Sequence, residues 1–164
     1  MTTQTLPHPT RIDIPADARS AVVEVLNARL ADAIDYALGL KQAHWNIKGR
    51  QFVALHEMLD TLHAEATEFG DLMAERAVML GGQARGTLEI AAGATTLTPY
   101  PVEARTMAEL LGALADRLGI LTRSVRAAIR TAETHEDAGT ADLFTEVSRG
   151  LDKHLWYLEA HLAG

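Results

Sequence analysis

The sequence predicts an all-α protein, in its simplest form a four-helix bundle with one long crossover between the second and third helices. The positions of the prolines support this, because residues 16–98 and 102–164 contain none and each stretch can hold long helices. Runs rich in alanine and leucine also repeat their apolar residues at helical spacing. The length of 164 residues suits one domain with a single core.

The first helix is expected over about residues 20–47, with Ser20 as its N-cap. Residues 1–19 carry prolines and scattered charges, and we expect them to form a flexible tail. The bundle domain is therefore predicted to span residues 20–164. The tail has no apolar core of the kind that a secretory signal needs, so no such signal is predicted.

The second helix is expected over about residues 51–80. Gly49 permits the turn that precedes it, and Gly81 with Gly82 provides its C-terminal stop. The connection that follows is long for chain without structure, so a short helix is predicted over residues 87–92.

The third and fourth helices are expected on either side of an acidic hinge. Thr106 and Glu109 match a capping box, which starts a helix that runs to about Glu133. The fourth helix follows over about residues 138–162, with Trp156 expected in the core.

Composition excludes several functions. The formal net charge of −7 is not that of a simple nucleic-acid binder, whereas it would attract cations. The chain contains no cysteine, which excludes disulfides and thiolate metal sites and agrees with a reducing cytoplasm. No apolar run reaches the length of about 18 residues that a membrane-spanning helix needs.

One stripe of the second helix carries metal-binding side chains. An α-helix turns about 100° per residue, so the five side chains fall within a stripe about 120° wide. They are His56, Asp60, His63, Asp71 and Glu75. Four of them form two pairs at i,i+4 spacing, in which both side chains can reach one ion.

The two pairs cannot serve one ion within a single chain. Asp60 and Asp71 lie eleven residues apart, which is roughly 16 Å along the helix axis. Either the chain holds two separate half-sites, or a second copy supplies the missing half. An antiparallel two-fold pairing with its axis near Glu65 would achieve the latter, and the small Ala64 and Ala66 would allow close approach.

His44 is a candidate fifth ligand, because it lies near the end of the first helix and across the glycine turn from His56. Two imidazoles with several carboxylates form a mixed nitrogen and oxygen shell. Such a shell suits Fe(II), Mn(II) or Zn(II) better than Ca(II) or Cu(I).

The residues around this stripe resemble the Dps family of ferritin-like mini-ferritins, named as DNA-binding proteins from starved cells. The resemblance extends over essentially the whole chain from about residue 20. It is carried by Lys41-Gln-Ala-His-Trp-Asn-Ile-Lys-Gly49, Phe52-x-x-Leu-His56-x-x-x-Asp60, Asp71-x-x-Ala-Glu75-Arg76, Leu80-Gly-Gly82 and Leu151-Asp-Lys-His-Leu-Trp156.

The resemblance implies a ferritin-like bundle that assembles into a hollow homo-dodecamer. It implies a ferroxidase centre at each dimer two-fold, with His44, His56 and Asp60 from one chain and Asp71 and Glu75 from its mate. Members oxidise Fe(II), preferably with hydrogen peroxide, and store the ferric mineral without an organic cofactor, protecting the cell from oxidative damage. A cytoplasmic location is implied, associated with the nucleoid where DNA is bound.

Further positions follow from the same resemblance. Trp45 is implied to lie near the centre, and His63 is on the stripe but outside the family's ligand pattern. Acidic residues near the hinge line the family's iron-entry pores at a three-fold axis. Asp142 is the best match, followed by Asp137 and Glu146, with Glu133 and Glu136 as weaker candidates.

Two other functions are weighed against this one. A DNA-binding protein of the same family would commonly use a lysine-rich tail, whereas residues 1–20 carry Arg11 and Arg19 against Asp13 and Asp17 and no lysine. A ferritin or bacterioferritin with its di-iron site inside one bundle would need Glu-x-x-His pairs. This sequence contains no such pair.

Overall fold

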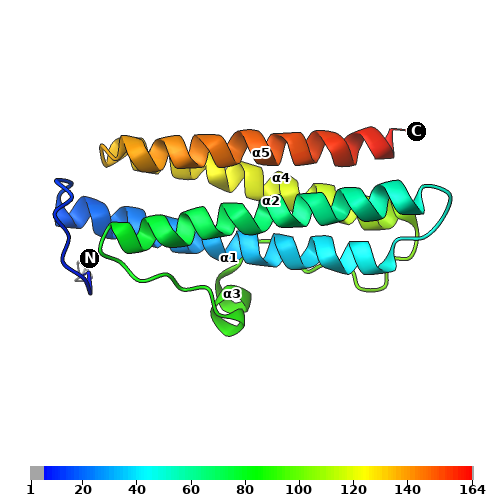
Figure 1. Cartoon of the computed structure of the whole chain (residues 1–164), viewed down its shortest axis with the longest axis horizontal. Helices are drawn as coiled ribbons and strands as arrows, with labels where there is room; N and C mark the ends of the chain where they lie inside the picture. The colour runs from blue at the N-terminus through cyan, green and yellow to red at the C-terminus, as the bar shows by residue number, and fades with distance from the viewer. Residues whose placement is uncertain (1–5, 164) are drawn as a thin grey trace.

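The structure is a computed structural model that describes residues 6–163. Four long helices form a bundle, and one short helix lies in the connection between the second and the third of them (Figure 1). The helices are α1 (Ala16–Asn46), α2 (Phe52–Met79), α3 (Leu88–Ala94), α4 (Met107–Thr134) and α5 (Ala138–Leu162). The predicted all-helical bundle with a long crossover is therefore confirmed.

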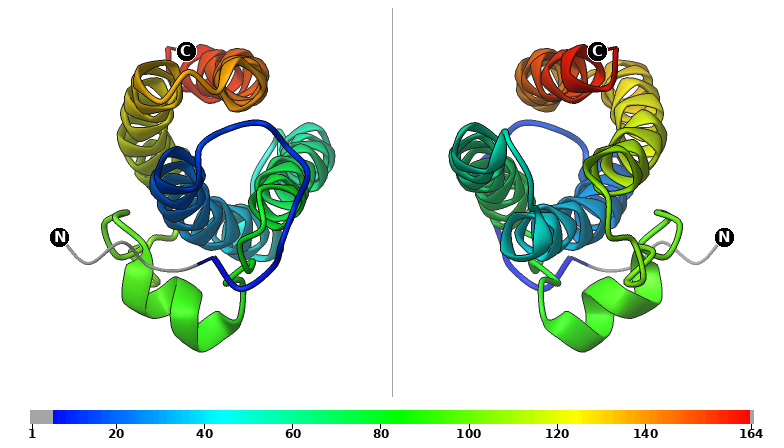
Figure 2. Two further views of the ribbon diagram at one scale, coloured as in Figure 1. Left: turned by 90° about the vertical axis from the view of Figure 1, so that its left-hand side faces the viewer. Right: turned by 90° about the vertical axis from the view of Figure 1, so that its right-hand side faces the viewer.

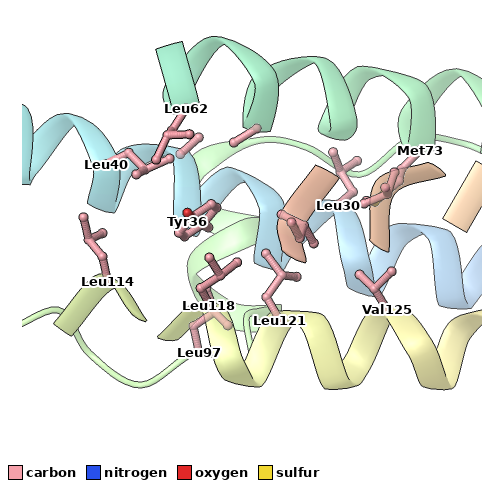
Figure 3. Packing of buried hydrophobic residues seen from close by; sticks show 14 of the residues in the cluster. Leu30, Tyr36, Leu40, Leu62, Met73, Leu97, Leu114, Leu118, Leu121 and Val125 are labelled. Atoms are coloured by element: carbon pink, nitrogen blue, oxygen red, sulfur yellow. The ribbon is translucent and has the colours of Figure 1, made fainter. Parts of the chain in front are cut away.

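The four long helices form two antiparallel pairs that are joined by the crossover. α1 is antiparallel to α2 and α4 is antiparallel to α5, while the connection through α3 runs back along the bundle (Figure 1). Seen end-on, the four long helices surround one core and α3 lies outside them (Figure 2). Leucines from all four long helices fill this core (Figure 3). Within residues 6–163, no helix is long and apolar enough to cross a membrane.

The predicted helix boundaries rest on local signals that the structure confirms. Gly49 and Gly81 have φ angles of 115° and 88°, so glycine is required at both turns. Thr106 accepts a hydrogen bond from the amide of Glu109, whose side chain accepts from the amide of Thr106, which completes the capping box. The short helix of the crossover begins after Thr87, as predicted.

The predicted start of the first helix at Ser20 is wrong. α1 begins at Ala16, and the amide of Arg19 already donates to the carbonyl of Pro15 at 2.9 Å. Pro15 can immediately precede a helix because its nitrogen needs no acceptor there. The boundary drawn at residue 20 therefore falls inside α1.

Most of the predicted N-terminal tail has a described structure. The amide of His8 donates to the carbonyl of Gly81 at 3.1 Å, at the end of α2. Ile12 and Ile14 pack against the core of the bundle. Residues 1–5 of the tail lie outside the described residues, and its flexibility stays a prediction.

The two tryptophans are on the surface of the chain. Trp156 is 64% exposed, so the expectation that it lies in the core is wrong. Trp45 is 65% exposed. The structured core is built from aliphatic side chains, with Tyr36 and Phe144 as its largest fully buried members.

Candidate metal centre

His44 and His56 form a stacked pair where the end of α1 meets the beginning of α2. Their ring centroids are 3.6 Å apart and the ring planes differ by 23°. Nδ1 of His44 lies 2.9 Å from the carbonyl oxygen of His56, and Nδ1 of His56 lies 3.0 Å from the carbonyl oxygen of His44. The glycine turn between the helices therefore brings two residues twelve positions apart into reciprocal contact.

This reciprocity determines which nitrogen of each ring is available. A carbonyl oxygen only accepts hydrogen bonds, so we assign the hydrogen of each neutral imidazole to Nδ1. The lone pair of each Nε2 is then free to bind a metal ion. Metal-binding histidines commonly have their other ring nitrogen fixed by a carbonyl or a carboxylate.

Asp60 lies one turn beyond His56 on α2 and is held by a lysine. Its Oδ1 accepts from Nζ of Lys41 at 2.6 Å and lies 3.7 Å from Nδ1 of His44. The hydrogen bond from Lys41 lowers the pKa of Asp60, and the charge of the lysine acts in the same direction. Asp60 is therefore an ionised, half-exposed carboxylate next to both imidazoles. We call His44, His56 and Asp60 the histidine group.

Asp71 and Glu75, which we call the carboxylate pair, are in a different situation. Both are exposed, and within residues 6–163 neither side chain makes a hydrogen bond or an ion pair. In the same part of the chain, no three histidine, aspartate or glutamate side chains converge as a metal site. One chain thus presents the five predicted ligands as two separate sets.

A groove of about 740 Å³ runs along α1 and α2 between these two sets. Asp71 and His63 lie at its edge, and the rest of its lining is mainly apolar. Ala64 is exposed in the groove, whereas Ala66 is 1% exposed and packs into the core of its own chain. Leu38 lines the groove and is 49% exposed, and Val78 and Met79 line a neighbouring hollow that shares Ala74 and Ala84 with it.

The two residues predicted to lie near the centre are beside the histidine group. His63 is half-buried, and burial followed by the charge of Lys41 lowers its pKa, so it is predominantly neutral. Trp45 follows His44 directly, and Nζ of Lys41 lies 5.8 Å from the centre of its ring.

Asp137 has a structural role that the sequence did not reveal. It is 1% exposed and caps α5, because its Oδ1 accepts from the amide of Thr140 at 2.9 Å. The same oxygen lies 2.7 Å from Nη2 of Arg76. Burial alone would raise the pKa of Asp137, but the bonds from Thr140 and Arg76 hold it below its usual value. These contacts occupy the carboxylate.

The other acidic residues near the hinge are exposed on the isolated chain. They are Asp142, Glu146, Glu133 and Glu136. Glu136 has a φ of 56°, a conformation that non-glycine residues adopt rarely. Their part in a pore, like that of Asp137, stays a prediction.

Sequence reasoning missed Lys41 as a partner of the site. It precedes His44 by three positions, which places both on one face of α1. That spacing was available in the sequence. The reciprocal bonds to backbone carbonyls were not, because they depend on how tightly the two helices meet.

Comparisons with known proteins agree with this architecture. A family model described as a ferritin-like domain matches residues 23–164. The DNA protection during starvation protein of Agrobacterium fabrum is 46% identical over 155 residues, which cover 94% of this chain and 96% of that protein. The corresponding protein of Brevibacillus brevis is 31% identical, over 86% of this chain and 94% of its own.

Solved structures of similar proteins have the same fold. DpsA14 from Streptomyces coelicolor superposes with a TM-score of 0.89 at 33% identity, covering 96% of this chain and 94% of that one. Mycobacterium smegmatis Dps gives a TM-score of 0.89 at 30% identity, covering 94% of each chain. This chain belongs to the Dps family, whose members have a ferritin-like domain.

Proposed function

We propose that this protein is a ferroxidase and iron store, which oxidises Fe(II) with hydrogen peroxide and retains the ferric product. The reciprocal bonding of His44 and His56 is the observation that carries the proposal. It leaves two Nε2 lone pairs free in a cluster that also holds the ionised carboxylate of Asp60, whose Oδ1 lies 3.7 Å from the ring of His44. Neutral imidazole and carboxylate together suit Fe(II), and carboxylates favour the ferric product.

The carboxylate pair of a second copy would complete this site. Two chains paired antiparallel about a two-fold axis would set each histidine group against the partner's carboxylate pair, giving two equivalent sites per dimer. The mainly apolar groove along α1 and α2 and the exposed Val78 and Met79 of the neighbouring hollow support this pairing. Further assembly into a dodecameric shell would provide the space for mineral.

Iron enters this site as a substrate. Binding of Fe(II) displaces the ammonium of Lys41 from Asp60, because both cations compete for the same oxygen. Hydrogen peroxide accepts two electrons, so two ferrous ions reduce one peroxide to two water molecules with two protons. No hydroxyl radical is released when both electrons are delivered together. The ferric ions then hydrolyse and pass to the interior.

The test removes the carboxylate pair, whose two side chains make no hydrogen bond or ion pair within the described part of one chain. Protein loaded anaerobically with Fe(II) is mixed with peroxide, and oxidation is followed by absorbance. Asp71→Ala with Glu75→Ala should slow oxidation more than roughly 100-fold, the upper range for loss of mere supporting contacts. Glu103→Ala with Glu159→Ala removes two exposed carboxylates elsewhere and should match wild type. Equal rates in both double variants would refute the site.

The mass in solution tests the shared site independently. A dodecamer elutes far above the 17.8 kDa of one chain in size-exclusion chromatography with light scattering. A monomer that still oxidised iron rapidly would contradict the proposal that two chains form each site.

DNA protection by this chain would then result from consuming iron and peroxide. The net charge of −7 disfavours direct contact with the phosphate backbone. A gel-shift series at low salt should show no retardation of duplex DNA. Retardation at or below 50 mM salt would instead support the alternative of a nucleoid-binding protein.

A further inference from the structure

A chain of three polar side chains crosses the interior of the bundle away from the candidate metal centre. Tyr36 on α1 and His154 on α5 are both 0% exposed. The hydroxyl of Tyr36 lies 3.4 Å from Nδ1 of His154, and Nε2 of His154 lies 2.9 Å from Oε2 of Glu65 on α2. Figure 3 shows Tyr36 among leucines, including Leu62 and Leu118.

The hydrogen bonds of these three side chains run in one direction, from Tyr36 through His154 to Glu65. Glu65 is a carboxylate, because hydrogen bonds from Lys153 and His154 lower its pKa although burial opposes them. It therefore accepts from Nε2 of His154, which leaves Nδ1 as the acceptor for the hydroxyl of Tyr36. Burial lowers the pKa of His154 and keeps the ring neutral. Burial also raises the pKa of Tyr36 well above its usual value, so the phenol keeps its proton.

This arrangement does not form a metal site. The two nitrogens of His154 point in different directions, one toward Tyr36 and one toward Glu65. The phenol and the carboxylate therefore do not converge on one point, and Lys153 already bonds the carboxylate at 2.9 Å. A linear relay of donor and acceptor is suited to moving a proton.

We propose that Tyr36 is a one-electron donor whose phenolic proton moves to Nδ1 of His154 when the phenol is oxidised. An oxidised phenol is a strong acid, so a buried tyrosine can lose an electron readily only if a base accepts its proton at the same time. Nδ1 of His154 is that base. The carboxylate of Glu65 stabilises the resulting imidazolium through Nε2.

The inference rests on the proposed ferroxidase function, which supplies the oxidant. When peroxide meets a site holding one Fe(II), that ion provides only one of the two electrons needed. Tyr36 provides the second. One Fe(II), one tyrosine, one neutral histidine, one hydrogen peroxide and two solvent protons give one Fe(III), one tyrosyl radical, one imidazolium and two water molecules.

The position of Tyr36 suits this role. It precedes His44 by eight residues on α1, which is roughly 12 Å along the helix. An electron can cross such a distance inside a protein. Full burial shields the radical from solvent, so a reducing equivalent, such as a later Fe(II), can restore the phenol.

The test uses freeze-quench electron paramagnetic resonance on the intact protein. Anaerobic protein loaded with one Fe(II) per site is mixed with peroxide and frozen within milliseconds. Wild type should give a tyrosyl signal that changes line shape when ring-deuterated tyrosine is incorporated, which separates it from a tryptophan radical. Tyr36→Phe should lose this signal, whereas Tyr100→Phe and Tyr157→Phe, which replace the other two tyrosines, should keep it. An unchanged tyrosyl signal in Tyr36→Phe overturns the proposal.

Two measurements separate this inference from the proposed function. With two Fe(II) per site, Tyr36→Phe should oxidise iron at the wild-type rate, because the second ion supplies the second electron. If wild type itself does not oxidise iron, the proposed function fails and the radical is sought without iron.

The iron-free measurement uses the Tyr100→Phe/Tyr157→Phe variant, in which Tyr36 is the sole tyrosine. Ultraviolet photolysis of the frozen protein then generates a radical on Tyr36. Its high-field g1 value should shift when His154→Phe is added, and an unshifted g1 value overturns the proton transfer.

Discussion

Two members of the histidine group, His56 and Asp60, lie on the same stripe of α2 as the carboxylate pair, yet the chain organises only the histidine group. In the histidine group, both rings are fixed by reciprocal bonds to backbone carbonyls and the carboxylate is held by Lys41. Asp71 and Glu75 are exposed and uncoordinated. The difference indicates that one chain preorganises the imidazole side of the site and leaves the carboxylate side to be positioned by assembly.

The apolar surroundings of the two sets explain this division. The histidine group lies where two helices meet at a tight turn, so intrachain packing can position it. The carboxylate pair lies among Ala74, Val78 and Met79, of which the last two are 50% and 53% exposed. Such a surface needs a partner before its side chains are fixed.

Complementation between two inactive variants gives the largest expected effect. His44→Ala with His56→Ala removes the imidazoles, and Asp71→Ala with Glu75→Ala removes the carboxylate pair. Each variant alone should be nearly inactive in peroxide-driven iron oxidation. A mixed dimer of the two has one site with all five ligands, so random co-assembly should restore about one quarter of wild-type sites.

Control assemblies make the result specific. The two variants mixed after separate purification, without dissociation and reassembly, should stay inactive because their dimers do not exchange. Failure of co-assembled protein to recover activity, with mixed dimers verified by mass spectrometry, would mean that the two sets do not belong to one site.

Most of the fold was predictable because its signals are local. Gly49, Gly81 and the Thr106 capping box each act within a few residues. The start of α1 was misplaced because Pro15, an allowed helix opening, was outweighed by the N-cap preference of Ser20. The ligand types followed from helical spacing, but the tautomers of His44 and His56 depend on contacts between helices, which spacing does not describe.

Buried polar groups were the least predictable. The place of Asp137 at a pore stays a prediction, but its bonds to Arg76 and Thr140 were not foreseen. His154 and Glu65 are 89 residues apart in sequence and meet only because α5 packs beside α2. The cap of Asp137 on Thr140 is local, but the contacts of Asp137 with Arg76 and of His154 with Glu65 have no local signature, since they depend on the packing of the bundle.

Asp137→Ala should give the next largest effect, because Asp137 is buried and anchors Arg76, the residue that directly follows Glu75. The substitution removes the cap of α5 and leaves Arg76 without its buried partner. We expect a loss of about 2–3 kcal/mol in the free energy of unfolding, measured by denaturant titration. Asp142→Ala, at an exposed position near the beginning of α5, should stay within about 0.5 kcal/mol of wild type. Equal stability of both variants would show that the ion pair contributes nothing.

Lys41→Met tests whether the ammonium of Lys41 competes with an incoming metal ion for the carboxylate of Asp60. Removing the ammonium 2.6 Å from Asp60 eliminates a competitor for the incoming metal. The apparent affinity for Fe(II), measured anaerobically by calorimetry, should rise about three- to tenfold, as expected for one nearby charge in a half-exposed site. Lys48→Met removes an exposed lysine of the neighbouring turn and should leave the affinity unchanged. A weaker affinity in Lys41→Met would mean that the lysine positions Asp60 more than it competes.

The smallest expected effect depends on pH and concerns His154 of α5, which contacts Glu65 in the middle of α2, between the two sets. Burial lowers the pKa of His154 below its ordinary value of 6.5, so the unfolded chain takes up a proton near that pH that the folded chain does not. Stability should therefore be constant at higher pH and fall as pH decreases through 6.5, by at most about 1.4 kcal/mol per pH unit for one proton. His63 acts in the same direction, whereas Glu65, whose pKa is lowered from 4.5, contributes only in more acidic solution. Thermal melts of His154→Phe between pH 7.5 and 5.5 should show a shallower decline than wild type, with His161→Phe, a half-buried histidine near the end of the same helix, as the control. An equal decline in His154→Phe would show that His154 is not the source of the acid sensitivity.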